Sequence, residues 1–211
     1  VIDDLSSGSV QNLEGVIHHT SVSIHQVDIC KREGLEEFLE GCDAVIHLAG
    51  LADIVPSIEQ PSRYYDVNVT GTLNLLEAAR ATGCKKVIYA ASSTCYGIPK
   101  NYPTPETAKL SPQYPYALTK LLGEQLVLHW SQVYGIDAIS LRLFNVYGPR
   151  VRTAGTYGAV MGVFLSQRAN SQPLTIVGTG QQTRDFTHVK DVAKAFVRAT
   201  EVTCDNKILN V

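Results

Sequence analysis

Short apolar runs of strand length alternate along this chain with longer segments of helical periodicity, and this alternation restricts the fold more than any other feature. The run Ser23–Ile29 predicts a strand, and Lys31–Glu40 after it predicts a short helix. Asp43–Ala49 and Lys86–Ala91 are nearly continuous apolar runs, separated by a predicted helix over Ser62–Ala81. Such strands are buried on both faces, as in a parallel sheet covered by helices on both sides. The pattern predicts a doubly wound α/β fold.

The second half of the chain continues the pattern and then changes. Tyr116–Tyr134 predicts another long helix, and Asp137–Phe144 the next strand. After Pro149 the elements shorten and glycines interrupt them, at Gly155, Gly158, Gly162, Gly178 and Gly180. We therefore expect residues 1–149 to form the main α/β domain. Residues 150–211 are expected to supply a partial substrate-binding cap and elements that return to the sheet, because ligands bind beyond the carboxyl ends of such strands.

Composition excludes several classes of function. The formal net charge of −2 gives no basic field for nucleic acid or an anionic membrane surface. No apolar run approaches the roughly 20 residues that a membrane span needs. The 5 cysteines are odd in number and form no CxxC pair, which indicates reduced thiols in a cytoplasmic protein and no zinc site.

The two ends of the chain are unusual. It begins without methionine at Val1-Ile2, and it stops at Leu209-Asn210-Val211, within what looks like a strand. We therefore expect a fragment that lacks the first βα unit and the C-terminal part of a longer protein.

Acidic and small residues follow three predicted strands, where a dinucleotide would bind. Asp3 follows Val1-Ile2, and a carboxylate there can accept hydrogen bonds from both adenosine ribose hydroxyls, which favours NAD over NADP. A turn formed by the Asp-Asp-Leu-Ser-Ser-Gly segment explains this residue equally well. Asp28 can reach the adenine amino group and Ile29 can cover the ring. Ala49-Gly50-Leu51 lets the backbone approach the pyrophosphate and ribose.

Tyr116 and Lys120 lie one helical turn apart, so that a phenol and an ammonium share one helix face. The pKa of a free phenol is near 10, and for a base near neutrality it must fall to about 7, which takes roughly 4 kcal/mol of preferential phenolate stabilisation. The ammonium and an oxidised nicotinamide can supply this stabilisation. Lys120 can also hydrogen-bond the nicotinamide ribose.

The same spacing occurs at Tyr96 and Lys100, so it proves little by itself. That copy spans Gly97 and Pro99, which break a helix, whereas Tyr116 lies within a strong helical pattern.

Ser92 gives Tyr116 a partner. It follows the Lys86–Ala91 strand, where cofactor and substrate would meet, and its hydroxyl can bridge the substrate hydroxyl and the phenol. The alternative is a serine that caps a strand end. The helical Tyr116 and Lys120 downstream favour catalysis, and Ser92, Tyr116 and Lys120 are the predicted catalytic residues.

These segments, in this order, resemble the motifs of extended short-chain dehydrogenases, and within them the NAD-dependent epimerase/dehydratase family, with UDP-glucose 4-epimerase as the nearest well-known type. The similar segments are Asp3-Asp4-Leu-Ser-Ser-Gly8, His47-Leu-Ala-Gly50, Asn68-Val-Thr-Gly-Thr72, Ser92-Ser-Thr-Cys-Tyr-Gly97, Tyr116-x-x-x-Lys120, Arg142-Leu-Phe-Asn-Val-Tyr-Gly-Pro149 and Arg184-Asp-Phe-Thr-His-Val-Lys-Asp191.

The resemblance implies a Rossmann domain over residues 1–149 that holds NAD tightly. It implies removal of hydride from C4 of a nucleotide sugar, with UDP as the expected nucleotide, while Tyr116 takes the hydroxyl proton; the 4-keto sugar then turns over and hydride returns to its other face. Asn68 and Phe144 would contact the cofactor. Asn145 and Arg184 would bind the substrate diphosphate, for which a guanidinium fork is suited.

One departure bears on the reaction. The related 4,6-dehydratases carry acidic residues just after the catalytic hydroxyl, whereas Ser93 and Thr94 stand here. Neither can act as that acid or base, which favours epimerisation over dehydration.

Alternatives remain open. A 4-keto-sugar reductase of the same family would consume NAD(P)H at each turnover, and a non-catalytic dinucleotide-binding relative would often lack the tyrosine or the lysine. The helices Ser62–Ala81 and Tyr116–Tyr134 resemble the pair through which these enzymes form homodimers. They could also do no more than cover the sheet.

Overall fold

A parallel four-stranded sheet forms the centre of the computed structural model, which describes residues 1–151, 160–176, 178–203 and 206–211. The strands are β3 (Ala44–His47), β4 (Lys86–Ser92), β5 (Asp137–Leu143) and β8 (Lys207–Asn210). They lie in the order β3-β4-β5-β8, and β4 pairs with β5 along its whole length, from Lys86 opposite Asp137 to Ser92 opposite Leu143. The expected parallel α/β architecture is confirmed.

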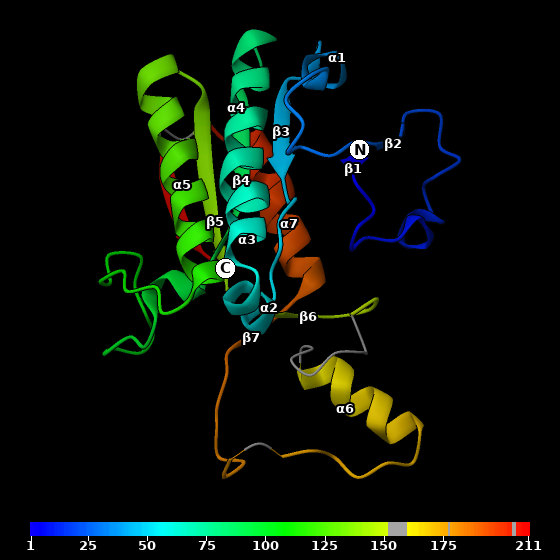
Figure 1. The fold of residues 1–211 in the computed structure, drawn as a ribbon, viewed down its shortest axis with the longest axis vertical. Helices are drawn as coiled ribbons and strands as arrows, with labels where there is room; N and C mark the ends of the chain where they lie inside the picture. The colour runs from blue at the N-terminus through cyan, green and yellow to red at the C-terminus, as the bar shows by residue number, and fades with distance from the viewer. Residues whose placement is uncertain (152–159, 177, 204–205) are drawn as a thin grey trace.

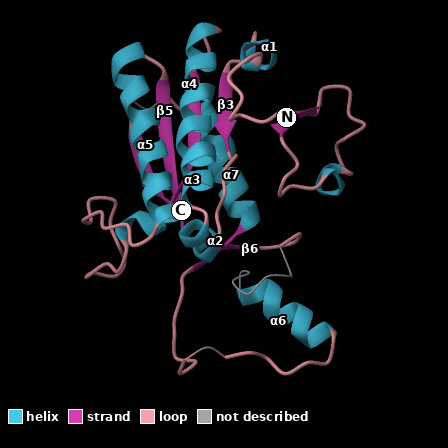
Figure 2. Cartoon of the chain, viewed as in Figure 1, coloured by secondary structure: helices cyan, strands magenta, loops and turns pink. Residues whose placement is uncertain are grey.

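Helices cover both faces of this sheet (Figures 1 and 2). On one face lie α4 (Gly71–Ala81) and α5 (Pro115–Tyr134), side by side. On the other lies α7 (Val189–Glu201), which contacts β4 and β5. The short α1 (Leu35–Leu39) packs against α4.

Helix α5 has clear start and stop signals. Tyr114 is extended, and Pro115 occupies the first helical turn, where its fixed φ suits a helix and its missing N–H is not needed. Gly135 ends the helix at φ +71°, a left-handed conformation that glycine adopts without strain. The predicted helix Tyr116–Tyr134 is therefore confirmed to within one residue.

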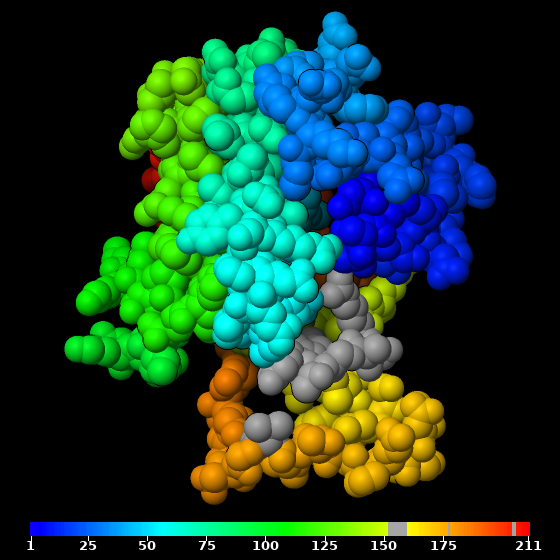
Figure 3. Space-filling model, in the orientation of Figure 1, coloured from blue at the N-terminus to red at the C-terminus, as the bar shows by residue number. Residues whose placement is uncertain are grey.

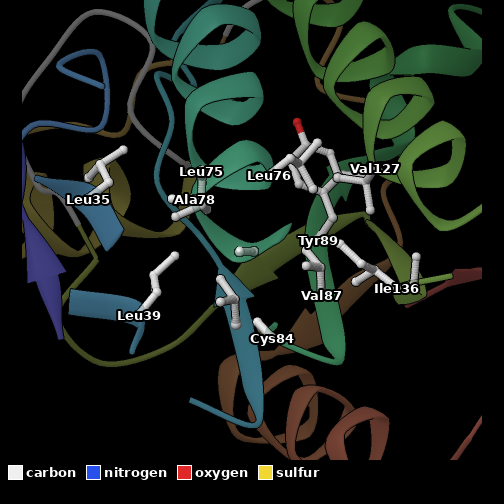
Figure 4. Close-up of a cluster of buried hydrophobic side chains, with 14 residues drawn as sticks. Leu35, Leu39, Leu75, Leu76, Ala78, Cys84, Val87, Tyr89, Val127 and Ile136 are labelled. Carbon is white, nitrogen blue, oxygen red and sulfur yellow. The ribbon is translucent and has the colours of Figure 1, made fainter. Parts of the chain in front are cut away.

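The alternation of side chains along β4 gives the sheet two separate cores. Val87, Tyr89 and Ala91 point into a cluster with residues of α4 and α5, of which Figure 4 labels Leu75, Leu76 and Val127 among others. Ile88 and Ala90 point to the opposite face. There they join Val192, Phe196 and Ala199 of α7. Every residue of β4 is buried, as the continuous apolar run predicted.

Two small parallel sheets lie beside the main one. β1 (Ile2–Asp3) pairs with β2 (His25–Gln26), and the 3-10 helix η1 (Val10–Leu13) lies in the long connection between them. β6 (Asn145–Tyr147) pairs with β7 (Phe186–His188), beyond the carboxyl end of β5. Helix α6 (Val160–Ala169) stands apart from the sheet, with the segment that leads to β7 (Figures 1 and 3).

The predicted helix Ser62–Ala81 is one helical stretch in three parts. It starts as α3 (Pro61–Tyr65), passes through a π-helical turn η2 (Asp66–Thr70), and continues as α4. Helix α2 (Ile54–Glu59) precedes it and was not expected from the sequence. Helix α7 was not expected either, although its buried residues Val192, Phe196 and Ala199 have helical spacing.

Helix α7 is anchored to the amino end of the sheet. Lys86 Nζ donates to the carbonyl oxygens of Ala199 (3.2 Å), Thr200 (3.4 Å) and Val202, at the end of α7. The same ammonium lies 3.0 Å from Asp137 Oδ2. A cation there satisfies the last carbonyl groups of the helix.

Two negative findings apply to the described residues. None of their helices is both long enough and apolar enough to cross a membrane. No three of their His, Cys, Asp and Glu side chains lie close enough together to hold a metal ion. Gly155 and Gly158, which marked the change of pattern in the sequence, and Cys204 lie outside the described residues.

Candidate active site

Ser92 is the last residue of β4, and its hydroxyl organises the turn that follows. Its Oγ accepts hydrogen bonds from the backbone N of Thr94 (3.3 Å) and from Thr94 Oγ1 (2.9 Å), at the start of the 3-10 helix η3 (Ser93–Tyr96). The Ser92 hydroxyl also interacts with the Tyr116 phenol and lowers its pKa. The capping role considered for Ser92 is therefore present, and its catalytic role beside the phenol stays a prediction.

Tyr116 lies in the first turn of α5, among aromatic rings. Its ring is 6.5 Å from that of Tyr64, edge to face, and 6.5 Å from that of Tyr114, nearly parallel. Burial raises the pKa of the phenol above its usual value, and the interaction with the Ser92 hydroxyl offsets part of this rise. The lowered pKa expected of a base is therefore not produced by these side chains alone.

Lys120 is buried directly after this turn of α5. It is only 6% exposed, and its Nζ lies 4.3 Å from the centre of the Tyr89 ring of β4. Burial lowers the pKa of this ammonium to about 7, against an opposing contribution from the Glu124 carboxylate. The Tyr89 face is a cation–π partner for the charge. Tyr89 was missed as a site residue, because in sequence it is one residue of a continuous apolar strand.

The π turn η2 brings Asn68 into contact with the loop after β3. Its side-chain Oδ1 accepts from Leu51 N (2.8 Å), and its Nδ2 donates to Leu51 O (3.0 Å) and to Thr119 Oγ1 of α5 (3.0 Å). Asn68 thus ties the loop to the helix that carries Tyr116 and Lys120. The direct cofactor contact predicted for Asn68 stays a prediction; the structure shows the amide engaged with Leu51 and Thr119.

Gly50 makes this close packing possible. A Cβ added there would lie 3.0 Å from Asn68 Oδ1 and 3.6 Å from Lys120 Nζ. Gly50 thus brings its backbone close to the Lys120 ammonium. The approach to a pyrophosphate and ribose predicted for Ala49, Gly50 and Leu51 stays a prediction.

A separate cavity of about 530 Å³ lies at the carboxyl ends of β1 and β2. It is lined by Asp4, Gln26, Val27, Asp28, Lys31 and Glu33. Asp28 Oδ1 also accepts from the backbone N of Cys30 (2.9 Å), which fixes the direction of its carboxylate. The predicted cofactor residue Asp28 therefore faces an open cavity.

Asp3 and Asp4 both form the turn that was the alternative to cofactor binding for their segment, and only Asp4 also lines the cavity. Asp3 Oδ1 accepts from Leu5 N (2.7 Å), and Asp4 Oδ1 accepts from Ser6 N (2.9 Å) and Ser6 Oγ (2.7 Å), so both shape the turn. It is Asp4 that lines the cavity. The ribose contact predicted for Asp3 stays a prediction.

Ile29 is buried beside helix α4. A Cβ added to Gly71 would lie 2.8 Å from Ile29 Cδ1, so that the glycine makes room for this side chain. Asn74 Nδ2 donates to the carbonyl oxygens of Ile29 (3.0 Å) and Cys30 (3.1 Å) and holds the segment in place. The structure shows Ile29 packed in the interior; the ring contact predicted for it is not tested.

The predicted substrate residues meet at the small sheet β6–β7. Asn145 pairs with Phe186 across this sheet, and Asn145 Nδ2 donates to Asp185 O (3.0 Å). Arg184 precedes β7 and is exposed, and its Nη1 donates to Thr183 O (2.7 Å). Phe144 packs against the cluster of Cys95, Tyr96 and Leu121. Asn145 and Arg184, which are far apart in sequence, thus both lie beyond the carboxyl end of β5, at the β6–β7 sheet.

The second tyrosine-lysine pair has no comparable geometry. Tyr96 ends η3 and is buried, with its hydroxyl bonded to Arg142 and Asn210. Lys100 follows Gly97, whose φ is +65°, and no helix joins Tyr96 to Lys100. The choice of Tyr116 on helical context is supported.

This chain was compared with protein families, with curated proteins and with solved structures. The model of the family described as "NAD dependent epimerase/dehydratase family" matches residues 1–211. A putative UDP-glucose 4-epimerase of Methanocaldococcus jannaschii is 33% identical over 212 residues, which covers 100% of this chain and 67% of the relative. The chain spans between 50% and 67% of the length of the first curated relatives that it matches.

Solved structures agree over the whole chain. A UDP-N-acetylglucosamine 4-epimerase from Methanobrevibacter ruminantium M1, in complex with UDP-N-acetylmuramic acid, has a TM-score of 0.95 at 37% identity, covering 100% of this chain and 67% of its own. The UDP-glucose 4-epimerase of Thermus thermophilus, in complex with NAD, has a TM-score of 0.88 at 32% identity, covering 100% and 68%.

Proposed function

Because this chain belongs to the NAD dependent epimerase/dehydratase family, we propose that the protein containing it is an NAD-dependent epimerase that inverts C4 of a UDP-linked sugar. The observation that carries the proposal is the group of Ser92, Tyr116 and Lys120. The Ser92 hydroxyl interacts with the Tyr116 phenol and lowers its pKa, and the Lys120 ammonium is buried one turn further along α5. The names of the similar proteins support the same reaction.

The described residues fit NAD at both ends of an extended site. The cavity at β1 and β2 offers the carboxylates of Asp4 and Asp28, which suit hydroxyl and amino donors of an adenosine. The loop at Gly50 lies close to Lys120, and a Cβ at Gly50 would be in tight contact with Asn68 Oδ1, at 3.0 Å. Ala49, Gly50 and Leu51 would therefore face the middle of the dinucleotide, with Phe144 near the nicotinamide.

When bound, NAD accepts a hydride from the sugar and returns it. The side chains of this protein would move the proton of the sugar hydroxyl at C4. Ser92 holds the substrate hydroxyl against the Tyr116 phenol, and Tyr116 takes the proton as the C4–H bond breaks. Because burial raises the Tyr116 pKa, the phenolate would need positive charge nearby. Lys120, one helical turn further along α5, and a bound oxidised nicotinamide would supply this charge.

Two observations bear on the reaction type and the substrate. Ser93 and Thr94, directly after Ser92, are neutral, and Thr94 Oγ1 is bonded to Ser92 Oγ, so that neither of these two positions supplies an acid for removing water from the sugar. Asn145 and Arg184 lie at one end of the β6–β7 sheet, where they would bind the diphosphate. The names of similar proteins favour UDP as the nucleotide.

The test is an assay of the full-length protein with UDP-, dTDP-, GDP- and CDP-linked sugars. NMR follows inversion at C4, and absorbance follows net NADH. We expect a new C4 epimer without net NADH turnover. Tyr116→Phe should lower kcat by a factor of about 100 or more, because the general base is removed. Steady NADH turnover without an epimer would instead indicate a 4-keto-sugar reductase, and full activity in Tyr116→Phe would exclude this base.

We also propose that the protein is a cytoplasmic homodimer. The free thiols of Cys30, Cys42, Cys84 and Cys95 support a reducing compartment. Helices α4 and α5 lie side by side on one face of the sheet, and Val133 and Tyr134 near the end of α5 are exposed. Light scattering after size-exclusion chromatography tests the dimer, and a monomeric mass at micromolar concentration would exclude it.

A further inference from the structure

The catalytic side chains come from two separate elements. Ser92 ends β4, whereas Tyr116 and Lys120 lie on α5. Ser92 and Tyr116 can act on one substrate hydroxyl only if the helix and the strand end keep a fixed position. A displacement of about 1 Å can cost a factor of about 100 in rate.

A buried ion pair ties α5 to the sheet one turn beyond Lys120. Glu124 of α5 accepts from Arg142 of β5 at both oxygens, Nε to Oε2 at 3.0 Å and Nη2 to Oε1 at 2.6 Å. Ser140 Oγ donates to the same Oε2 at 2.7 Å. Glu124 and Arg142 are each 2% exposed, so solvent screens this pair very little.

The third nitrogen of the guanidinium reaches the other catalytic element. Arg142 Nη1 donates to Tyr96 Oη at 2.7 Å, and Tyr96 ends the η3 turn that starts directly after Ser92. The guanidinium also lies 4.9 Å from the centre of the Tyr96 ring. Arg142 therefore contacts, at one planar group, both the helix of Tyr116 and Lys120 and the turn of Ser92.

Further hydrogen bonds join Tyr96 and Arg142 to β8 and to the loop that contains Glu106. Tyr96 Oη donates to Asn210 Oδ1 of β8 at 2.8 Å, and Arg142 Nη1 also donates to Glu106 O at 3.2 Å. Asn210 N donates to Glu106 Oε1 at 2.8 Å. The connection is a network in which every bridging group has a partner, which is the condition for a rigid buried polar cluster.

Stability alone does not explain this pair. Replacing a buried ion pair by apolar residues of similar volume is often neutral or stabilising, because desolvation offsets the attraction. Its position relative to the catalytic residues suggests another role. The Glu124 carboxylate opposes the effect of burial on the pKa of Lys120. Among the described residues, His47 of β3 and Tyr89 of β4 also interact with Lys120, and Tyr116 lies one helical turn away on α5.

We propose that Glu124 and Arg142 are positioning residues of this active site: the pair sets α5 against the Ser92 turn and holds the charge of Lys120. The inference rests on the proposed function for its effect on rate. Its effect on Lys120 does not depend on which sugar, if any, is turned over.

The test is the double variant Glu124→Gln/Arg142→Gln of the full-length protein. Removing both charges avoids leaving one of them buried and unpaired, which would be strongly destabilising. We expect a folded protein in which kcat falls about 100-fold while KM stays within a few-fold. We also expect the pKa of Lys120, followed by heteronuclear NMR of the lysine ε-methylene, to move lower. An unchanged kcat in active protein, or an unchanged Lys120 pKa, overturns the proposal.

A matched control separates positioning from stability. Lys86 and Asp137 form another ion pair of low exposure, 3.0 Å apart, at the amino ends of β4 and β5, opposite to the catalytic end. Lys86→Met/Asp137→Asn should change stability while kcat and the Lys120 pKa stay as in the wild type. An equal loss of kcat in this control would mean that any weakened sheet impairs catalysis, and would overturn the proposal.

A milder variant covers the case in which the double variant does not fold. Tyr96→Phe removes the hydroxyl that joins Arg142 to Asn210 and keeps the ring. We expect kcat to fall by up to about tenfold, as for one net hydrogen bond, with KM unchanged. Wild-type kcat in Tyr96→Phe counts against the proposal. If the wild type epimerises none of the sugars, the proposed function fails, and the Lys120 pKa in the double variant Glu124→Gln/Arg142→Gln decides the inference alone.

Discussion

His47 shows how strongly the environment of one residue can depart from what its type suggests. It is 2% exposed on β3, and its Nε2 lies 2.8 Å from Thr72 Oγ1. Thr72 Oγ1 itself donates to Asn68 O at 2.7 Å, so it must accept from a protonated Nε2 of His47. The other nitrogen, Nδ1, then carries no proton, and it has no hydrogen-bond partner among the described residues.

This environment predicts an acid-sensitive fold. Burial, with the nearby Lys120 charge, lowers the pKa of His47 from 6.5 to about 3. Between these two values the unfolded chain binds more protons, so the free energy of unfolding decreases as the pH falls from 6.5 towards 3. We expect a slope of up to about 1.4 kcal/mol per pH unit from this residue, measured by urea unfolding between about pH 7 and pH 5.

The control for His47 is a second histidine. His47→Gln should lose this part of the pH dependence, whereas His18→Gln, at an exposed position, should keep it. The same slope in wild type and His47→Gln would mean that the buried imidazole is not its source.

At the residue scale, the sequence indicated the proposed reacting groups better than the residues that support them. Ser92, Tyr116 and Lys120 could be proposed because helical context and strand ends are visible in sequence. Glu124, Tyr89 and Thr119 could not, because a helix residue finds its strand partner only through packing. The direction of the Tyr116 pKa could not be predicted either, since it depends on how deeply the phenol is buried.

At the scale of elements, α5 fits against β4 through a single glycine. A Cβ added to Gly123 would lie 2.3 Å from Tyr89 Oη and 3.1 Å from Asn68 O. Tyr89 is fully buried under Lys120, and Asn68 O belongs to the π turn, so neither can move freely. The helix therefore lies as close to the strand as a residue without a side chain allows.

Gly123→Ala should accordingly force α5 away from β4. We expect a loss of about 1–3 kcal/mol in the free energy of unfolding, as for other overpacked interiors, measured by urea titration. Gly15→Ala is the matched control, because nothing lies within 4 Å of a Cβ there. It should stay within about 0.5 kcal/mol of the wild type. Equal stability of both variants would show that α5 has room for the methyl group.

Elements were predictable where one pattern dominated. The continuous apolar runs gave β3, β4 and β5 nearly to the residue, and Pro115 and Gly135 marked both ends of α5. The π turn within the expected helix Ser62–Ala81 was not predictable, because its register depends on the bonds of Asn68 to Leu51 and Thr119. Helix α7 was missed after Pro149, although its apolar spacing is visible in the sequence.

At the scale of the whole molecule, the charge of the β1–β2 cavity predicts cofactor choice. Its lining includes three carboxylates, Asp4, Asp28 and Glu33, and one ammonium, Lys31. A 2′-phosphate on the adenosine would add further negative charge there. We expect NAD to bind more tightly than NADP.

Thermal unfolding of the full-length protein with each nucleotide measures this preference. A ligand at about 100 times its Kd stabilises the folded state by about 2.7 kcal/mol, which raises the Tm. NAD should raise the Tm at lower concentrations than NADP does. Asp28→Asn should narrow the difference. A larger shift with NADP would contradict the assignment of this cavity to an adenosine without a phosphate.

The bond between Tyr96 and Asn210 has a consequence for the time at which the active site can form. These partners are 114 residues apart in the chain, and Asn210 belongs to β8, the last strand of the sheet. A ribosome adding about 5–20 residues per second needs roughly ten seconds to reach Asn210 after it has made Tyr96. During synthesis, Ser92, Tyr116 and Lys120 are therefore all present well before the hydrogen bond between Tyr96 and Asn210 can form. Under the proposed function, the nascent protein would have its catalytic residues before the contacts that align their elements.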